Sequence, residues 1–287
     1  MHTYSRRLGQ IALRLAVVLL TFSSFVVAAP KSITIKGSDT MVILGQRWAE
    51  AYMKSHPGAV VQVTGGGSGT GIAALINGAT DIAQASRPMK AEEKAAAKAH
   101  NGKDVAETPV ALDGLSVYVD AKNPIEKISM PQLKSIYTGA TTKWDEVGVP
   151  LGPIIVYGRE NNSGTYSFFK EHVLGNADFA AEVLSLPGTA AVINAVSKDK
   201  RAIGYGGIAY SKGTKILKVS KDEKGPAIEP SMANVDSGKY PLSRSLYFYT
   251  SGQPEGDVKA FMDWVRGPEG QKICQDVGYF PLAKKAR

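Results

Sequence analysis

Cysteine is nearly absent from this sequence, since Cys274 is the only one among 287 residues. One thiol cannot form an intramolecular disulfide bond, so no disulfide framework can hold the fold together. It also cannot supply the several thiolates of a structural zinc site. Cys274 follows an isoleucine in a segment with helical periodicity, and we expect it to be a small buried residue rather than a reactive thiol.

Histidine is scarce as well: the four histidines are scattered, and none has the spacing of zinc ligands. The glycine-rich segment Gly65–Gly71 lacks the lysine of a nucleotide-binding P-loop and does not complete a Gly-x-Ser-x-Gly nucleophile elbow. A hydrolase needs a nucleophile, a base or a metal cluster. We therefore expect no catalytic residue, no metal ion and no cofactor, and we interpret the chain as a binding protein rather than an enzyme.

Long apolar runs are also missing, because no stretch reaches the roughly 20 residues that span a bilayer. Leu15–Val27 is a shorter, mostly apolar run, preceded by a pair of arginines and followed by Ala28 and Ala29. This is the pattern of a signal peptide, and we place the cleavage after Ala28. No cysteine follows the run, which excludes lipid attachment there. We expect a periplasmic protein exported by a cleaved signal peptide, residues 1–28.

The charge balance is only mildly positive. The whole chain has a formal net charge of +8, and residues 1–28 contain three arginines and no acidic residue, so the remaining 259 residues carry +5. No basic run interleaved with aromatic residues predicts contact with nucleic acid. The excess of positive charge suits an anionic ligand but does not identify which anion. A length of 259 residues is enough for two lobes of ordinary domain size.

Short β-branched runs alternate with amphipathic stretches along the rest of the chain, which is the pattern of an α/β protein. The predicted strands are Ile33–Lys36, Val60–Val63, Asp81–Ala85, Ile154–Tyr157, Ala202–Tyr205 and Ser245–Thr250. The predicted helices are Thr40–Ser55, the segment from Gly65–Gly71 to Asn77, Ala91–Ala99, Pro131–Tyr137, Ser163–Val173, Thr189–Val196, Asp257–Val265 and Glu269–Val277.

No linker rich in serine, glycine or proline separates two independent domains. We therefore expect two doubly wound α/β lobes, with the chain crossing between them in strands that act as a hinge. Val110–Val119 and Leu242–Thr250 are the candidate crossings. Lobe 1 would comprise residues 29–113 and 246–287, and lobe 2 would comprise residues 114–245.

A Ser-Gly-Thr triplet occurs twice, at Ser68-Gly69-Thr70 and at Ser163-Gly164-Thr165, and each opens a predicted helix. A helix N-terminus offers unpaired N–H groups and a partial positive charge, and serine or threonine adds a hydroxyl donor. A third instance is Gly37-Ser38-Asp39-Thr40. One such segment alone is typical of ordinary helix capping. Three of them, divided between the two lobes, predict an anion site.

Two arginines lie close to these segments. Arg159 precedes Ser163 by four residues, and Arg87 follows Ser86 at the end of a predicted strand. A guanidinium offers a fork of donors that matches two oxygens of a phosphate. We expect Arg159 to bind the anion, whereas a surface ion pair is the alternative for Arg87.

Five segments together resemble a known family. In order they are Gly37-Ser38-Asp39-Thr40-Met41, Gly65-Gly66-Gly67-Ser68-Gly69-Thr70-Gly71, Asp81-Ile82-Ala83-Gln84-Ala85-Ser86-Arg87-Pro88, Leu112-Asp113-Gly114 and Gly158-Arg159-Glu160-Asn161-Asn162-Ser163-Gly164-Thr165. They are similar to the periplasmic phosphate-binding proteins of ABC phosphate importers, from about Ile33 to the C-terminus. The resemblance implies a type II periplasmic-binding-protein fold that captures inorganic phosphate between its lobes. It also implies delivery of phosphate to the permease subunits of the importer, and we expect the protein to be a monomer.

The family pattern, carried over residue by residue, implies which side chains bind phosphate. The first lobe would contribute contacts from two helix starts and one strand end, and the second lobe would contribute the arginine loop. The implied ligand-binding residues are Ser38, Asp39, Thr40, Ser68, Gly69, Thr70, Ser86, Arg87, Asp113, Arg159, Ser163, Gly164 and Thr165.

The sequence departs from the best-known members of that family at Arg87, where they have an aspartate that accepts the proton of hydrogen phosphate. A sister group has Ser-Arg there, as in Ser86-Arg87, together with the Asp-Gly pair found at Asp113-Gly114. We therefore predict Asp113 as the proton acceptor and keep Asp39 as the alternative.

Two other functions remain open on the sequence. A binding protein for sulfate, molybdate or a phosphonate would share the fold and most of the site. A fully deprotonated anion gains nothing from a carboxylate in the pocket, which favours hydrogen phosphate. A periplasmic phosphatase is the weaker alternative, because the catalytic groups are missing.

Overall fold

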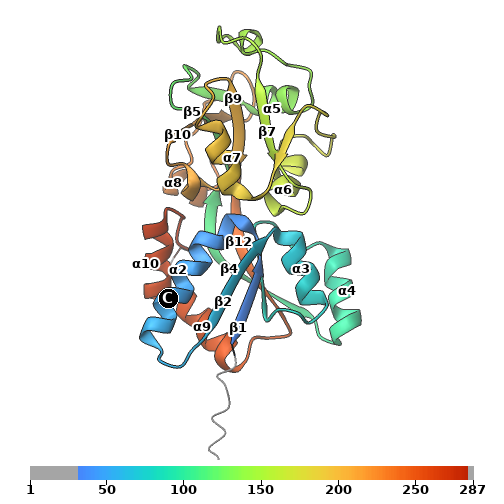
Figure 1. Cartoon of the computed structure of the whole chain (residues 1–287), viewed down its shortest axis with the longest axis vertical. Coiled ribbons are helices and arrows are strands. Elements are labelled where there is room, and N and C mark those ends of the chain that lie inside the picture. Colours follow the sequence, from blue (N-terminus) through green and yellow to red (C-terminus); the bar gives the residue numbers. More distant parts are fainter. Residues whose placement is uncertain (1–31, 284–287) are drawn as a thin grey trace, which may run out of the picture. The chain divides into compact units, whose positions relative to one another are not determined.

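Two five-stranded sheets organise the part of the chain that the computed structural model describes, residues 32–283. Figure 1 shows helices on both sides of each sheet, the first sheet below and the second above. The predicted signal peptide, residues 1–28, lies outside the described residues. Within residues 32–283 there is no helix with the length and apolar character that a membrane crossing needs.

The first sheet has the strand order β2-β1-β3-β12-β4. Its parallel part consists of β1 (Ile33–Gly37), β2 (Val61–Gly66) and β3 (Ile82–Ala85). The late strand β12 (Ser243–Ser251) pairs antiparallel with β3 on one side and with β4 (Val105–Gly114) on the other. The C-terminal part of the chain therefore completes the sheet that the N-terminal part begins.

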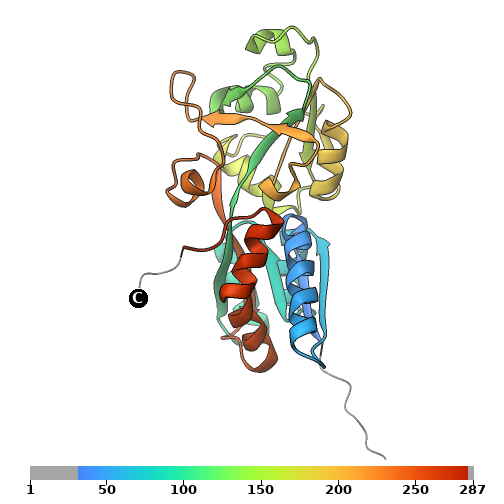
Figure 2. The ribbon, with the colours of Figure 1, turned by 90° about the vertical axis from the view of Figure 1, so that its left-hand side faces the viewer.

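Both faces of the first sheet are buried under helices. Figures 1 and 2 show α2 (Val42–Ser55) beside α10 (Pro268–Val277), with α9 (Gly256–Arg266) on the same side. Their apolar side chains form one core with β1, β4 and β12. On the other face α3 (Ser68–Ile76) and α4 (Ala91–Asn101) form a second, smaller core with β3.

Cys274 lies on α10 inside the larger core and has no exposed surface, as predicted. Burial, with a contribution from the charge of Asp113, raises the pKa of its thiol to about 12. The thiol therefore stays protonated near neutral pH, and a protonated thiol is a poor nucleophile.

The second sheet has the order β10-β5-β9-β7-β8 and repeats the plan of the first. β7 (Ile155–Arg159), β8 (Leu184–Leu186) and β9 (Ala202–Gly206) are parallel. β5 (Ser116–Asp120) pairs antiparallel with β9 and with the edge strand β10 (Thr214–Ile216).

The second sheet is also covered on both faces. α5 (Met130–Tyr137) and α6 (Gly164–His172) pack on the face that carries Val117 and Val119. α7 (Gly188–Val196) packs on the opposite face, and Figure 1 shows it in front of β9. Each sheet is therefore the middle layer of three, which confirms the predicted α/β class and doubly wound arrangement.

Every predicted strand and helix is present, with ends that differ by a few residues. The helix expected from Thr40 begins instead with a 3-10 turn, Asp39–Met41, before α2. The elements that the sequence did not indicate are all short, because three-residue strands and single helical turns show too little periodicity. The unpredicted strands are β6 (Lys127–Ser129), β8, β10 and β11 (Lys218–Ser220). The unpredicted helical segments are α8 (Met232–Asp236) and two 3-10 turns, Trp144–Val147 and Ile208–Tyr210.

The chain passes between the sheets at two places that the sequence indicated. Leu115 separates β4 of the first sheet from β5 of the second, and the chain rejoins the first sheet where β12 begins. β12 starts at Ser243, which pairs with Gly114, so the lobe boundary predicted after residue 245 falls inside a strand of the first sheet. The lobe limits and the hinge stay predictions.

We predict that Trp48→Phe lowers the free energy of unfolding by about 1–3 kcal/mol, the usual effect of leaving a buried polar group unpaired. Trp48 of α2 is fully buried, and its indole N–H donates to the carbonyl oxygen of Gly270 in α10 at 2.7 Å. Phenylalanine cannot donate this bond, so the carbonyl would lose its partner. Urea unfolding of the two proteins measures the difference.

Trp264→Phe is the matched control. The indole N–H of Trp264 donates to the exposed carboxylate of Glu269 at 2.8 Å, where water can replace it. We expect a loss below about 1 kcal/mol. Equal losses in both variants would show that ring size, rather than the buried hydrogen bond, ties α2 to α10.

Candidate anion-binding site

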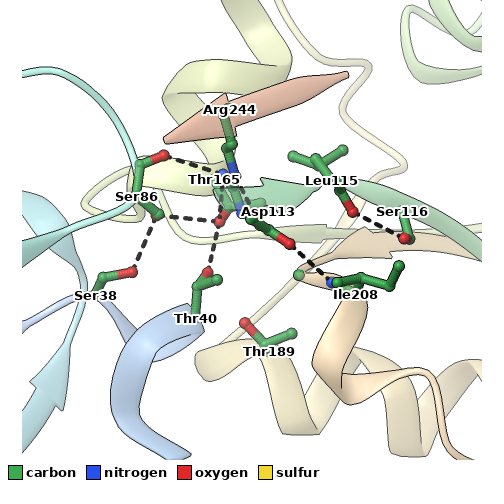
Figure 3. Close-up of polar contacts among 12 residues, drawn as sticks. Ser38, Thr40, Ser86, Asp113, Leu115, Ser116, Thr165, Thr189, Ile208 and Arg244 are labelled. Atoms are coloured by element: carbon green, nitrogen blue, oxygen red, sulfur yellow. Dashed lines mark hydrogen bonds and ion pairs between the residues drawn. The ribbon is translucent and has the colours of Figure 1, made fainter. Parts of the chain in front are cut away.

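Five hydroxyl groups from distant parts of the sequence meet between the two sheets. We call Ser38, Thr40, Ser68, Ser86 and Thr165 the hydroxyl cluster; each is at most 2% exposed. Thr40 and Thr165 are joined by a hydrogen bond of 2.8 Å between their Oγ1 atoms. Ser38 donates to Ser86 Oγ at 3.0 Å, and Ser86 Oγ lies 3.4 Å from both Ser68 Oγ and Thr165 Oγ1. Figure 3 shows four of these residues pointing toward one another.

The topology explains why these residues meet. Ser38 and Ser86 follow the neighbouring parallel strands β1 and β3, and Ser68 opens α3 after β2. Ligands of open α/β sheets bind where the carboxyl ends of parallel strands share one edge. Thr165 is in the first turn of α6, which follows β7 of the second sheet. The hydroxyl cluster therefore joins the carboxyl edges of both sheets.

Gly164 permits this close approach. A Cβ atom at this position would lie 2.9 Å from Ser86 Oγ and even closer to Ser68 Oγ. Such a distance is far below a normal contact, so a larger residue would push α6 away from the first sheet. The glycine in the second Ser-Gly-Thr triplet thus serves packing between the sheets.

Helix capping accounts for only one of the three serines in the repeated motifs. Ser163 Oγ accepts from the backbone N–H groups of Thr165 at 3.2 Å and Tyr166 at 3.3 Å, so it is an ordinary N-cap of α6. Ser38 is the N-cap of the 3-10 turn but makes no side-chain cap hydrogen bond, and Ser68 is the first residue of α3, whose N-cap is Gly67. Their hydroxyls are directed into the hydroxyl cluster instead.

Arg159 is buried beside the hydroxyl cluster, with 1% of its surface exposed. Its Nη2 donates to Asp39 Oδ2 at 2.9 Å, and its Nη1 donates to Thr189 Oγ1 at 2.8 Å. Burial lowers the pKa of the guanidinium, while the negative charge of Asp39 acts against this effect. Its Nε has no protein partner among the described residues. Arg159 therefore links β7 of the second sheet to the turn between β1 and α2.

Asp39 is held from two further sides. Its Oδ1 accepts from the backbone N–H of Gly66 at 2.8 Å, and Tyr210 donates to its backbone oxygen at 2.8 Å. Burial raises the pKa of Tyr210 to about 12, so this hydroxyl remains a donor near neutral pH. The Asp39 side chain keeps 20% exposure, which leaves its carboxylate in contact with solvent.

Asp113 is fully buried and paired with an arginine that the sequence analysis did not identify. Its Oδ2 accepts from Arg244 Nε at 2.9 Å and Nη2 at 2.7 Å, and its Oδ1 accepts from the Ile208 N–H at 3.0 Å. The remaining Arg244 nitrogen, Nη1, donates to Thr165 Oγ1 at 3.1 Å and to Ser86 O at 3.2 Å. Figure 3 shows this contact between Arg244 and the hydroxyl cluster.

A signal for Arg244 was present in the sequence. Arg244, Leu246 and Phe248 occupy alternate positions of β12 and are all buried. Successive side chains of a strand point to opposite faces, so a charged residue in phase with two apolar ones must be buried and paired.

Arg87, one of the predicted ligands, makes no hydrogen bond to the hydroxyl cluster among the described residues, and its role stays a prediction. Its two terminal nitrogens donate to Glu93 Oε2 at 2.8 Å and Oε1 at 2.7 Å. Gly69 and Thr70 also make other contacts: Gly69 N–H donates to Asn162 O, and Thr70 Oγ1 accepts from the Asn162 side-chain amide. These residues hold the loops around the hydroxyl cluster.

The donors gathered here are of the kind that suits an anion. It combines five hydroxyl donors with two buried guanidinium groups, and charge-assisted hydrogen bonds to anions are strong. No group of three or more histidine, cysteine, aspartate or glutamate residues suited to a metal ion occurs within residues 32–283.

Known proteins resemble this chain over nearly its whole length. A family model described as the PBP superfamily domain matches residues 27–269. The phosphate-binding protein PstS of Pseudomonas aeruginosa is 33% identical over 266 residues, which are 87% of this chain and 82% of that relative. PstS of Bacillus subtilis is 32% identical over 255 residues, covering 88% and 82%.

Two solved structures share the fold. A candidate phosphate ABC transporter substrate-binding protein from Clostridium perfringens, with bound phosphate, has a TM-score of 0.80 and 28% identity; the match covers 88% of this chain and all of that one. An ABC-type phosphate transport receptor from Vibrio cholerae has a TM-score of 0.70 and 28% identity at the same coverage. The range matched by the family model, residues 27–269, includes both sheets and every residue of the hydroxyl cluster.

We predict that Arg87→Met lowers the free energy of unfolding by about 1–3 kcal/mol at pH 7, because Glu93 loses charge-assisted hydrogen bonds. Partial burial raises the pKa of Glu93, but hydrogen bonds from Arg87 and the Lys90 N–H outweigh it, so the folded pKa lies below the ordinary value. A lowered carboxyl pKa stabilises the fold above the ordinary pKa, and this contribution disappears as the pH falls through the folded value. The loss should therefore shrink at pH 3.

Urea unfolding of parent and variant at pH 7 and pH 3 measures this dependence. Lys94→Met on the same helix is the control, since the ion pair of Lys94 with Glu107 is more exposed and should contribute less than about 1 kcal/mol. A loss for Arg87→Met that is equal at both pH values would mean that Arg87 stabilises by packing alone.

Proposed function

Because this chain belongs to the periplasmic-binding-protein (PBP) superfamily, and within it to the family of the PstS phosphate-binding proteins, we propose that it captures inorganic phosphate for an ABC importer. Its two-sheet α/β architecture is that of the type II members of the superfamily. The observation that carries the proposal is the convergence of the hydroxyl cluster and Arg159 from opposite sheets. The first sheet contributes Ser38, Thr40, Ser68 and Ser86, and the second contributes Thr165 and Arg159.

Phosphate suits this set of donors. A tetrahedral anion presents oxygens in four directions, and the hydroxyl cluster draws its donors from the ends of β1 and β3 and the starts of α3 and α6. Serine and threonine hydroxyls can also accept a hydrogen bond, so they tolerate an oxyanion that still carries a proton. Arg159 adds a fixed positive charge at the edge of the same group.

Binding would require the two sheets to separate and close again. Thr40 and Thr165 lie in direct hydrogen-bond contact at 2.8 Å, which leaves no space for phosphate between them. A ligand entering there would exchange hydroxyl–hydroxyl bonds for hydroxyl–oxyanion bonds. Hinge closure of two lobes around a ligand is the movement of periplasmic binding proteins, and the strand crossings at Val110–Val119 and Leu242–Thr250 are its candidate hinge.

The contacts divide the predicted ligand residues into three groups. We propose direct binding by the hydroxyl cluster, Gly164 and Arg159, with Ser163 holding the start of α6. Asp39 and Asp113 are the two candidates for the acceptor of the phosphate proton. Arg87, Gly69 and Thr70 would support the surrounding loops without touching phosphate.

We further propose a periplasmic, monomeric and non-enzymatic protein whose partners are the permease subunits of the importer, with no nucleic acid and no cofactor. The names of the similar proteins describe phosphate binding and transport rather than catalysis. The segment with the signal-peptide pattern supports export. Another oxyanion, such as sulfate, molybdate or a phosphonate, is the alternative ligand, and titration with phosphate and then sulfate separates the two.

We predict that Arg159→Ala weakens phosphate binding at least about 30-fold, because truncating one member of a buried charged contact costs about 2–5 kcal/mol. Isothermal titration calorimetry of phosphate-free protein measures the dissociation constant, and circular dichroism checks the fold. Arg201→Ala is the control: Arg201 directly precedes β9 of the same sheet but pairs with Asp199 at the surface. Near-parent affinity in Arg159→Ala would remove Arg159 from the site.

We also predict that Asp113→Asn relaxes discrimination against sulfate more than it weakens phosphate binding. Hydrogen phosphate can donate its proton to a buried carboxylate, whereas sulfate would face an unpaired acceptor, and a buried mismatch of this kind is rejected by roughly 10⁴–10⁵. Asp113 is fully buried, while water can reach Asp39 and soften its selectivity. The asparagine oxygen can still accept from Arg244.

The measurement is competition by sulfate and by arsenate in the parent, Asp113→Asn and Asp39→Asn proteins. Arsenate, which carries the same proton as phosphate, should compete in the parent. If only Asp39→Asn relaxes selectivity, the acceptor is Asp39. If neither variant does, no carboxylate accepts the proton.

A further inference from the structure

Arg244 is held in one orientation by its surroundings. It lies directly opposite Asp113 in the pairing of β12 with β4, and both Nε and Nη2 donate to the same oxygen of that carboxylate. Its guanidinium carbon lies 5.4 Å from the centre of the Phe168 ring, which packs against it. The side chain is 2% exposed. With two nitrogens fixed on Asp113, the third nitrogen, Nη1, is the one directed at the hydroxyl cluster.

The contact from Nη1 settles the direction of one hydrogen bond in the cluster. An arginine nitrogen only donates, so Thr165 Oγ1 must accept from Arg244 across their 3.1 Å contact. A hydroxyl has one proton, and that proton cannot point toward Nη1. It remains available to Thr40 Oγ1 at 2.8 Å, to Ser86 Oγ at 3.4 Å, or to an oxygen of a bound anion.

Ser68 is oriented in the same way by a different group. Its Oγ accepts from the backbone N–H of Ser86 at 3.1 Å, and a backbone N–H is also an obligate donor. The proton of Ser68 is then free for Ser86 Oγ or for a ligand. Two hydroxyls of the cluster, one from each sheet, thus accept from a fixed donor and keep their own protons directed elsewhere, which is the polarity that an anion requires.

The contact also depends on how the sheets are placed. Arg244 and Asp113 belong to paired strands of the first sheet, whereas Thr165 belongs to α6 beside the second. Ser86 O, the other acceptor of Nη1, follows β3 of the first sheet. The bond to Thr165 therefore exists only when α6 lies against the first sheet, and it orients the hydroxyl in that arrangement.

We infer that Arg244 is a positioning residue for the anion: fixed by Asp113, it acts through Thr165 by making that hydroxyl a donor when the two sheets are closed. This inference rests on the proposed function. It assigns no direct contact between Arg244 and phosphate. Its consequence is that the contribution of Arg244 to affinity depends on the presence of the Thr165 hydroxyl.

A double-mutant cycle tests this dependence, with phosphate affinity measured by calorimetry in the parent, Arg244→Lys, Thr165→Val and the double variant. Lysine keeps a positive charge near Asp113 but lacks the fork that reaches Asp113 and Thr165 together. We expect Arg244→Lys to weaken binding about tenfold, the usual effect of one charge-assisted hydrogen bond. In the Thr165→Val background the same change should have an effect below about twofold. Thr165→Ser, which keeps the hydroxyl, should restore the sensitivity to Arg244→Lys.

Three results would overturn the inference. They are parent-like phosphate affinity in Arg244→Lys, additive losses of affinity in the double variant, or no effect of Arg244→Lys on affinity in the Thr165→Ser background. A parent that binds no phosphate would instead refute the proposed function, so the two failures are distinct. Arg201→Lys at the surface is the control for a change of arginine to lysine. If urea unfolding shows that Arg244→Lys is not folded, the combined change Arg244→Met and Asp113→Asn, which removes both charges, takes its place in the cycle. Phosphate affinity is then compared with and without Thr165→Val.

Discussion

The buried ion pair between Asp113 and Arg244 connects the fold of this protein to its candidate site. It lies where β4 and β12 pair, next to the point at which the chain leaves the first sheet for the second. A buried charge is costly unless a partner and further hydrogen bonds satisfy it. Here the Ile208 N–H donates a further hydrogen bond to the carboxylate, and Ser86 O and Thr165 Oγ1 accept from the guanidinium nitrogen that does not bind Asp113. The pair is therefore satisfied only when segments of both sheets are in place around it.

Arg159 and Arg244, the two arginines closest to the hydroxyl cluster, follow one pattern. Arg159 is fixed by Asp39 and Thr189, and Arg244 is fixed by Asp113. Each carboxylate belongs to the first sheet, so Arg159 pairs across the sheets and Arg244 pairs within its own. Separation of the sheets would break the first ion pair, whereas the second would keep both of its charged partners and lose only its hydrogen bonds with Ile208 and Thr165. The Arg244 pair is thus suited to be a fixed reference in the first sheet, and the Arg159 pair to be a contact that forms on closure.

The sequence was sufficient for the α/β plan and for most of the hydroxyl cluster, because repeated motifs at helix starts and strand ends carry the positions that meet. It could not place Arg87, since the choice between a ligand and Glu93 depends on how the first turn of α4 folds back over the end of β3. The sequence motifs did not identify Arg244, which lies 85 residues after Arg159 and belongs to no glycine-rich motif. Only the alternation along β12 indicated its burial, and only the strand pairing identifies Asp113 as its partner.

Hydroxyl groups rather than further charges line the centre of the site, and the energetics of burial give a reason. A hydroxyl buried without a partner is destabilising, but the members of the hydroxyl cluster satisfy one another through bonds such as that between Thr40 and Thr165. The same groups can turn to an anion without leaving a charge unpaired when it departs. Their mutual bonds weaken net affinity, since each must be exchanged for a bond to the ligand. Fixed donors such as Arg244 and the Ser86 N–H reduce this cost because they already hold two of the hydroxyls with their protons free to donate.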